Sequence, residues 1–134
     1  MGAWGTGVFD NDSALDWVWE LEAVSGTDLL QATFDTVNEA QYREATDCSE
    51  ALAAAEVVAA LLGNPSDSLP NEIVEWLAKN QTAVDTRLQA SAWTAVDHIL
   101  VDSELRELWS ESVDFDAWQN LLQELMHRLA PPTS

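Results

Sequence analysis

The chain has 134 residues, which is enough for one domain. It carries 24 acidic and 5 basic side chains, so its formal net charge is −19 at pH 7. Five cations are too few for a protein that binds nucleic acid by neutralising phosphates, and so acidic a chain is repelled by an anionic membrane surface. Hydrophobic residues make up 47% of the sequence, which favours a folded domain over disorder.

Three further features of the sequence limit where the protein can be located and what chemistry it can perform. The N-terminal segment has neither the basic residues nor the long apolar stretch of a signal peptide. The longest apolar run, Ala51 to Leu62, is interrupted by Glu56 and is too short to cross a bilayer. The single cysteine, Cys48, excludes an internal disulfide and a thiolate metal cluster. We therefore expect a cytoplasmic protein without a cofactor, a nucleic-acid partner or a membrane.

Helical periodicity runs through almost every segment after residue 12, and no segment shows sustained strand alternation. The first predicted helix has Ser13 as its N-cap and ends at Ser25-Gly26. A second helix begins with Asp28. The expected apolar positions of the first helix are Leu15, Val18 and Trp19, with Ala14, Trp17 and Leu21 as looser candidates, and those of the second are Leu30, Phe34 and Val37.

The segment of about residues 48–62 is the most informative element of the sequence. Asp47 and Glu50 have the spacing of a capping box, and Gly63 ends the helix. Ala51 to Leu62 is apolar on all sides except at Glu56, and a helix of this kind is normally buried on most sides. We expect it to be the central helix of the fold.

The C-terminal half predicts four more helices, at about residues 70–80, 82–101, 103–109 and 114–129. The sequence therefore predicts an all-α, single-domain bundle of six to seven helices over residues 1–134. An irregular, Gly-rich arm precedes it at 1–12, and a flexible tail follows at 131–134. Four bases lie four residues after an acid, and on a helix each such pair contributes about 0.2–0.5 kcal/mol. The pairs are Glu39–Arg43, Glu75–Lys79, Asp102–Arg106 and Glu124–Arg128.

The glycines of Gly2 to Gly7 suggest a phosphate-binding loop, but the preceding strand and the Lys-Ser/Thr pair that such loops need are missing. We interpret this segment as an arm that packs Trp4 and Phe9 into the core. Asp10-Asn11-Asp12-Ser13 is similar to the start of a calcium loop, but the later Gly and the distal Glu are absent. Capping of the helix start and its dipole are sufficient to explain these side chains. Trp4, Asp10 and Asp12 are kept as candidate binding residues, the two aspartates also as candidate metal ligands.

Glu56 is the one ionisable residue inside the apolar run, and an unpaired buried carboxylate is costly. The first interpretation is that it reaches water at the edge of the helix. A second is a buried link to an indole N–H, to Arg87 or to His98. A third is an acid–base role, because perturbed carboxylates mark active sites. Glu56 is therefore the candidate catalytic residue.

Glu124 and His127 have the Glu-x-x-His spacing of carboxylate-bridged di-iron bundles, which makes them candidate metal ligands. Such centres need two copies of the motif, and this chain has one. A solvated last turn, in which His127 and Arg128 complement the helix dipole, is the alternative. Cys48 lies at the start of the Ala-rich helix, where the dipole favours a thiolate but Asp47 and Glu50 oppose it.

Three segments together resemble a known family. Met1 to Asp12, Ala53 to Gly63, and Ser103 to Trp109 with Trp118 are similar to the opening, central and C-terminal parts of domain-of-unknown-function family 4259. The resemblance covers essentially the whole chain. It implies a small bacterial helical domain and supplies no catalytic residue.

Two functions from different classes fit the sequence. The first is a non-enzymatic interaction domain whose acidic surface binds a basic protein partner, in the manner of an immunity protein or an antitoxin that covers a cationic cleft. Mimicry of DNA by the carboxylates is a variant of this hypothesis. The second is a small carboxylate- or metal-dependent hydrolase that uses Glu56 with Asp10 and Asp12, and it requires these three side chains to converge in a pocket.

Overall fold

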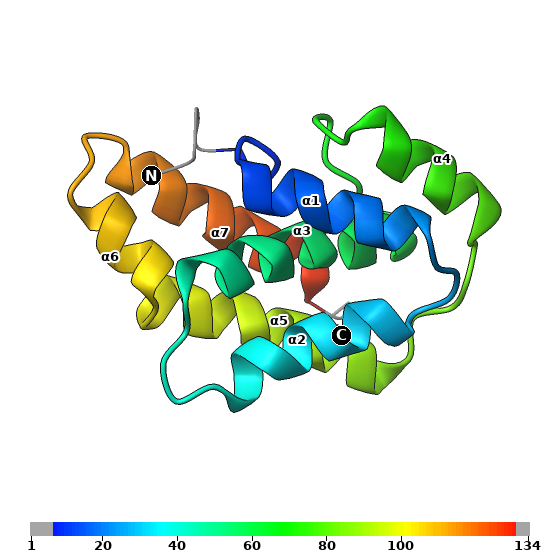
Figure 1. Ribbon diagram of the computed structural model, residues 1–134, viewed down its shortest axis with the longest axis horizontal. Helices are drawn as coiled ribbons and strands as arrows, with labels where there is room; N and C mark the ends of the chain where they lie inside the picture. Colours follow the sequence, from blue (N-terminus) through cyan, green and yellow to red (C-terminus); the bar gives the residue numbers. More distant parts are fainter. Residues whose placement is uncertain (1–6, 131–134) are drawn as a thin grey trace.

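The computed structural model describes residues 7–130, and within this range the chain forms seven α-helices and no β-strand (Figure 1). The predicted all-α, single-domain fold is confirmed. The tail at 131–134 and most of the expected arm lie outside the described residues. The helices are α1 (Asp12–Glu22), α2 (Asp28–Glu39), α3 (Ala45–Leu61), α4 (Asn71–Lys79), α5 (Thr86–Val101), α6 (Glu104–Ser110) and α7 (Phe115–Leu129).

The Ala-rich helix α3 is the central element, as its composition predicts. It contacts each of the other six helices, and every side chain from Ala51 to Ala59 is buried. Small alanine side chains let neighbouring helices approach closely, while Leu52, Val57 and Val58 fill the space between them. One of the nine consecutive buried side chains, Glu56, is ionisable.

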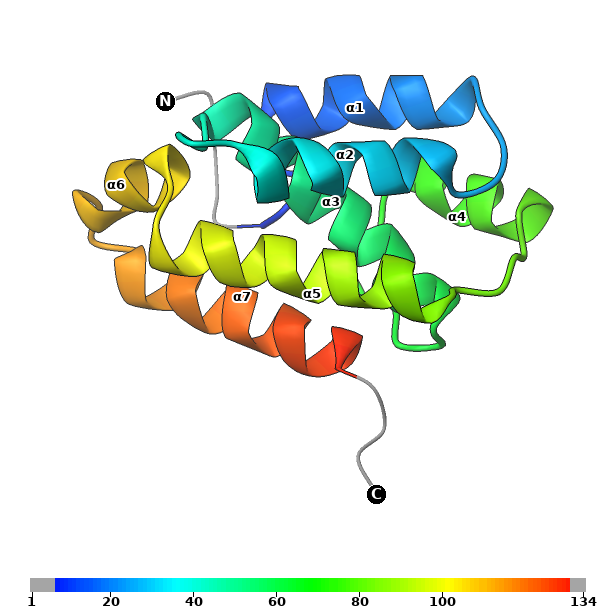
Figure 2. The same cartoon turned by 90° about the horizontal axis from the view of Figure 1, so that it is seen from below.

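The remaining helices surround α3 on several sides. Figure 2 shows α7, α5, α2 and α1 following one another across the molecule, with α6 and α4 at its two ends. The contacts of α5 with α2 and α7, and of α1 with α4, agree with this order. Within residues 7–130, no helix is both long and apolar enough to cross a bilayer. Of the predicted arm, Val8 is buried and Phe9 packs partly against the core, while Trp4 lies outside the described residues.

The buried face of α1 differs from the prediction. Ala14, Trp17, Val18 and Leu21 are buried, whereas Leu15 and Trp19, which the sequence placed on the core face, are exposed. Both sets have helical spacing, so the spacing alone does not separate them. The buried set continues to the apolar Leu21 at its next turn. The set that contains Leu15 and Trp19 instead continues to the charged Glu22, which disfavours its burial.

Three helices begin at other residues than predicted. α1 begins at Asp12, because its N-cap is Asn11, which accepts from the Ala14 N–H, and not the predicted Ser13. α3 begins at Ala45, before the expected capping box, because the Glu104 side chain of α6 accepts a hydrogen bond from the Ala45 N–H at 2.7 Å. α5 begins at Thr86 rather than near Thr82, because the Asp85 side chain caps this end of the helix and accepts from the Leu88 N–H at 2.7 Å. The predicted N-cap of α6 is confirmed, since Ser103 Oγ accepts from the Arg106 N–H.

The expected acid–base pairs along helices form in one case of four among the residues that the structure describes. Arg128 pairs with Glu124, as predicted. Arg43 lies beyond the end of α2 and instead donates to the carbonyl oxygens of Val37 and Asp102. Arg106 lies on α6, whereas Asp102 is the C-cap of α5. The Arg106 guanidinium donates to the Leu100 carbonyl instead. Pairing at this spacing needs one continuous helix, which a loop interrupts in both of these cases. Glu75 and Lys79 share α4 but are not at ion-pair distance, and nothing in the structure explains this.

Candidate functional site

Glu56 lies in the middle of α3 and is 3% exposed, so the interpretation that it reaches water is wrong. The alternative of a buried link is correct in kind, but its partner is Arg128 of α7 rather than Arg87, His98 or an indole. Arg87 instead lies 3.7 Å from Asp35 at the surface. The seventy-two residues that separate the two partners in the sequence hid this pair from any argument based on local spacing.

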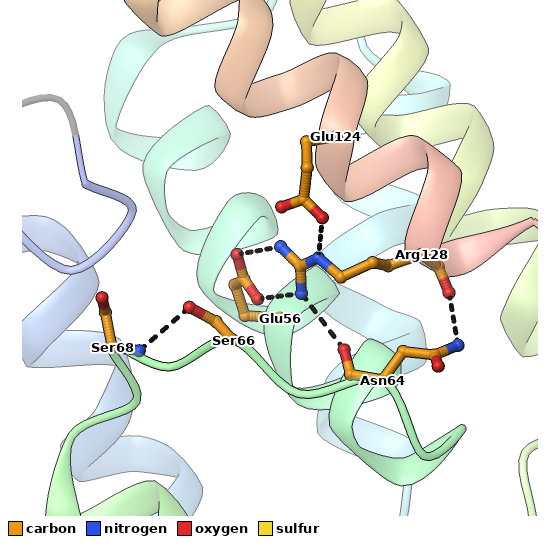
Figure 3. A network of polar contacts seen from close by, with 6 residues as sticks. All are labelled: Glu56, Asn64, Ser66, Ser68, Glu124 and Arg128. Atoms are coloured by element: carbon orange, nitrogen blue, oxygen red, sulfur yellow. Dashed lines mark hydrogen bonds and ion pairs between the residues drawn. The ribbon is translucent and has the colours of Figure 1, made fainter.

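The guanidinium of Arg128 binds both oxygens of the Glu56 carboxylate (Figure 3). Nη1 donates to Oε1 at 2.8 Å and Nη2 donates to Oε2 at 3.0 Å, which is the two-pronged geometry that favours arginine over lysine. Nε donates to Glu124 one turn earlier on α7. Arg128 therefore faces the core from the last turn of α7, so the solvated turn that the sequence suggested describes the exposed His127 and not Arg128.

The loop after α3 completes this network. Gly63 adopts φ 93°, and the N–H groups of Gly63 and Asn64 donate to the carbonyls of Ala60 and Ala59. This arrangement is a Schellman motif, for which glycine is favoured because it adopts positive φ without strain. It brings Asn64 against α7, where its carbonyl accepts from Arg128 Nη1 at 3.2 Å and its side-chain amide donates to the Arg128 carbonyl at 3.1 Å.

The chemistry of this network is that of a structural link. The hydrogen bonds to Glu56 raise the pKa of the Arg128 guanidinium, and those to Glu124 act in the same direction. Both carboxylate oxygens of Glu56 accept from the guanidinium. Asp10 accepts from the Gly7 N–H, and Asp12 is exposed in the first turn of α1. Within residues 7–130, no hydrogen bond or ion pair joins Asp10 or Asp12 to Glu56.

The candidate metal ligands are likewise dispersed. Glu124 is occupied by Arg128, and His127 is exposed on α7. Asn11, between the candidate ligands Asp10 and Asp12, caps α1 by accepting from the Ala14 N–H at 2.8 Å. Over the described part of the chain, no three His, Cys, Asp or Glu side chains are grouped in a way that could hold a metal ion.

Cys48 is buried in the first turns of α3. Burial raises the pKa of its thiol to about 12, and the neighbouring Ser103 side chain only partly opposes this shift. Its Sγ lies 3.8 Å from the Arg43 carbonyl and donates to it. The thiol is therefore a small packed side chain at the start of α3, and its raised pKa opposes formation of a thiolate.

A groove of about 190 Å³ lies between α1, α2 and α3 and has an acidic wall. Glu20 of α1 faces Asp47 and Glu50 of α3 across it, and Thr33 and Thr36 of α2 complete the lining. Burial raises the pKa of Glu50, and repulsion from Glu20, Asp47 and Asp16 raises it further. This shift marks a local excess of negative charge that no nearby cation offsets.

A second groove, of about 300 Å³, lies on the other flank of α1 against α4. Glu22 faces Glu72 and Glu75 of α4 there, with Lys79 as the cation in the lining. Trp76 fixes α4 in this position, because its indole N–H donates to the Val24 carbonyl at 2.9 Å. The helix α1 thus has carboxylates along both of its flanks.

Trp19 lies on the solvent-facing side of α1. It is 80% exposed, the most exposed tryptophan in the described part of the chain, and Trp93 on α5 follows at 38%. Asp16 precedes it by three residues and Glu22 follows it by three, so both carboxylates neighbour it on the helix surface. Sequence reasoning placed this side chain in the core. Glu22 on the same face was the available signal against that placement.

The fold and these sites define a small, strongly acidic, all-α domain with an internal arginine–carboxylate link. The sequence model of the domain of unknown function family 4259 matches residues 2–121, and the chain belongs to this family. Neither the curated proteins nor the solved structures contain a match to the chain.

Proposed function

We propose that this protein is a non-enzymatic interaction domain that binds a basic protein partner through its acidic surface. The observation that carries the proposal is the placement of the cations. Of the 24 acidic side chains, Asp35, Glu56 and Glu124 have an ion-pair partner within residues 7–130. Among the described residues, no Lys, Arg or His side chain lies at ion-pair distance from any other carboxylate.

The arginines act mainly inside the fold. Arg43 and Arg106 donate to backbone carbonyls at helix ends, and Arg106 also lies 5.1 Å over the ring of Phe115. Arg128 holds Glu56. The net charge of −19 is therefore carried by the surface, where it accelerates encounter with a cationic partner by about 10- to 1,000-fold at low salt.

The kind of partner follows from this charge. A protein with a cationic cleft, such as a nuclease, offers the complementary potential, and a domain that covers the cleft acts as an immunity protein or an antitoxin does. A cytoplasmic location is part of the proposal. The hydrolase alternative lacks a supporting observation, because Glu56 is bound by Arg128.

The experiment is affinity capture from lysate of the producing cell at about 50 mM and about 500 mM salt, where the Debye length falls from about 14 Å to about 4 Å. We expect a basic partner that forms a defined stoichiometric complex. With the purified partner, the association rate should fall steeply with salt while the dissociation rate changes little. If no basic protein is retained in a salt-sensitive way, the proposal is wrong.

A further inference from the structure

We propose that α1 is the docking surface for an arginine-bearing segment of a basic protein, in which one guanidinium stacks on the Trp19 indole and neighbouring cations pair with the carboxylates on both sides of the helix. This inference rests on the proposed function, which gives the sign of the partner's charge. It adds the place of contact on the fold and the chemical group that is recognised there.

The first observation is the exposure of Trp19. A tryptophan side chain contributes about 150–250 Å² of buried surface when it is packed, yet this one is 80% exposed while Trp17, two residues earlier, is 1% exposed. Leu15, one turn before Trp19 on the same face, is exposed as well. As far as residues 7–130 are concerned, the outer face of α1 therefore presents a largely uncovered indole beside a partly exposed aliphatic side chain.

The second observation is charge complementarity. Asp16 and Glu20 lie toward α3, where Glu20 lines the groove with Asp47 and Glu50. Glu22 lies toward α4 and lines the other groove. An indole flanked on both sides by carboxylates suits a planar cation, because the ring face attracts the cation and the carboxylates accept its N–H groups.

Arginine fits this surface better than lysine does. A guanidinium stacks on an aromatic ring with its flat face and still directs N–H donors outward at its edge. An ammonium group is more strongly hydrated and has no flat face to stack. The surface therefore predicts a preference for arginine that depends on Trp19, in addition to the general attraction of an acidic protein for any cation.

The test compares fluorescently labelled nona-arginine and nona-lysine peptides as probes, with dissociation constants measured by anisotropy at about 50 mM salt. For the unmodified protein we expect nona-arginine to bind about fivefold more tightly. Trp19→Ala should reduce this preference to about onefold, because it removes the stacking face. The matched control Trp93→Ala, which removes the half-exposed indole of α5, should leave the preference unchanged.

A second pair of variants tests the position of the charges. Asp16→Asn with Glu22→Gln removes two carboxylates beside Trp19, and Glu107→Gln with Glu111→Gln removes two exposed carboxylates at α6. Both changes lower the net negative charge equally. We expect the α1 variant to weaken both peptides by about three- to tenfold more than the α6 variant does.

The two proposals fail in different ways. If both peptides bind but Trp19→Ala leaves the arginine preference as it was, the docking surface is wrong and the proposed function stands. Equal effects of the α1 and α6 variants also overturn the docking surface. If neither peptide binds at about 50 mM salt, the acidic surface does not recruit cationic chains and both proposals are wrong. Thermal unfolding by circular dichroism verifies that each variant is folded.

Discussion

Removal of the Arg128 guanidinium should destabilise the protein strongly. In Arg128→Met, the Glu56 carboxylate, which is 3% exposed, loses the donors of both its oxygens. Removal of one partner of a buried ion pair costs about 3–5 kcal/mol. The Arg128 side chain is 15% exposed, so its shortening opens a route for water toward Glu56 and we expect the lower limit of about 3 kcal/mol. For a chain of this length, this corresponds to a fall in Tm of about 10 °C.

The assay is urea unfolding followed by circular dichroism and by tryptophan fluorescence, which should give coincident transitions and an unchanged slope. Two further variants test whether the loss of stability in Arg128→Met comes from the unpaired Glu56 charge. Glu56→Leu with Arg128→Met removes both charges, and we expect its stability to lie within about 1 kcal/mol of the unmodified protein or above it. Glu124→Gln removes the acceptor that is 57% exposed and should cost less than about 1 kcal/mol.

Two results would refute this reasoning. The first is a loss below about 1 kcal/mol in Arg128→Met, which would mean that the buried carboxylate finds other donors or water. The second is a double variant no more stable than Arg128→Met. In that case the loss would come from the packing of the arginine stem and not from an unpaired charge.

Three further predictions concern single side chains. Cys48 should resist Ellman's reagent at about pH 8 in the folded protein and react fully in guanidinium, because its pKa of about 12 keeps the thiol protonated; rapid reaction of the folded protein would contradict this. Glu50→Gln should stabilise the protein by about 0.5 kcal/mol at pH 7, because the raised pKa of Glu50 means that its charged form is less favourable in the folded state than in the unfolded state. This gain should vanish below about pH 4, where Glu50 is protonated in both states. Urea titrations at several pH values measure the gain, and a gain that does not change with pH would contradict this explanation. Asp85→Ala should cost about 1 kcal/mol in thermal unfolding by removing the side-chain cap of α5, and an unchanged Tm would show that the Leu88 N–H is satisfied by water.

The fold could be read from the sequence because helical periodicity is a local property. The central position of α3 followed from its uniformly apolar composition, and the Ser103 cap followed from one residue type before a helix. The start of α3 could not be predicted, because the acceptor for the Ala45 N–H comes from Glu104, fifty-nine residues away. Local patterns do not encode which distant side chain completes a helix end.

The candidate sites show the same division. That Glu56 needed a partner followed from its apolar surroundings, but the identity of Arg128 depends on how α7 docks. Trp19 was misplaced because two faces of α1 satisfy the same spacing, and the core selects one of them by packing. The sequence predicted that the surface is negatively charged. It did not predict where the carboxylates gather, because the acidic grooves form where α1 meets α3 and α4.

The two long-range contacts of α3 have a consequence for the order in which the protein becomes stable. The N-terminal end of this helix is capped by α6, and its buried carboxylate is neutralised by α7. During synthesis, α3 therefore emerges well before α6 and α7, which supply these two contacts. An N-terminal fragment that ends before α6 lacks the partners of Glu56 and of the Ala45 N–H, and it also exposes the face of α3 that α6 and α7 cover. The first five helices should accordingly gain full cooperativity only once the last two have docked.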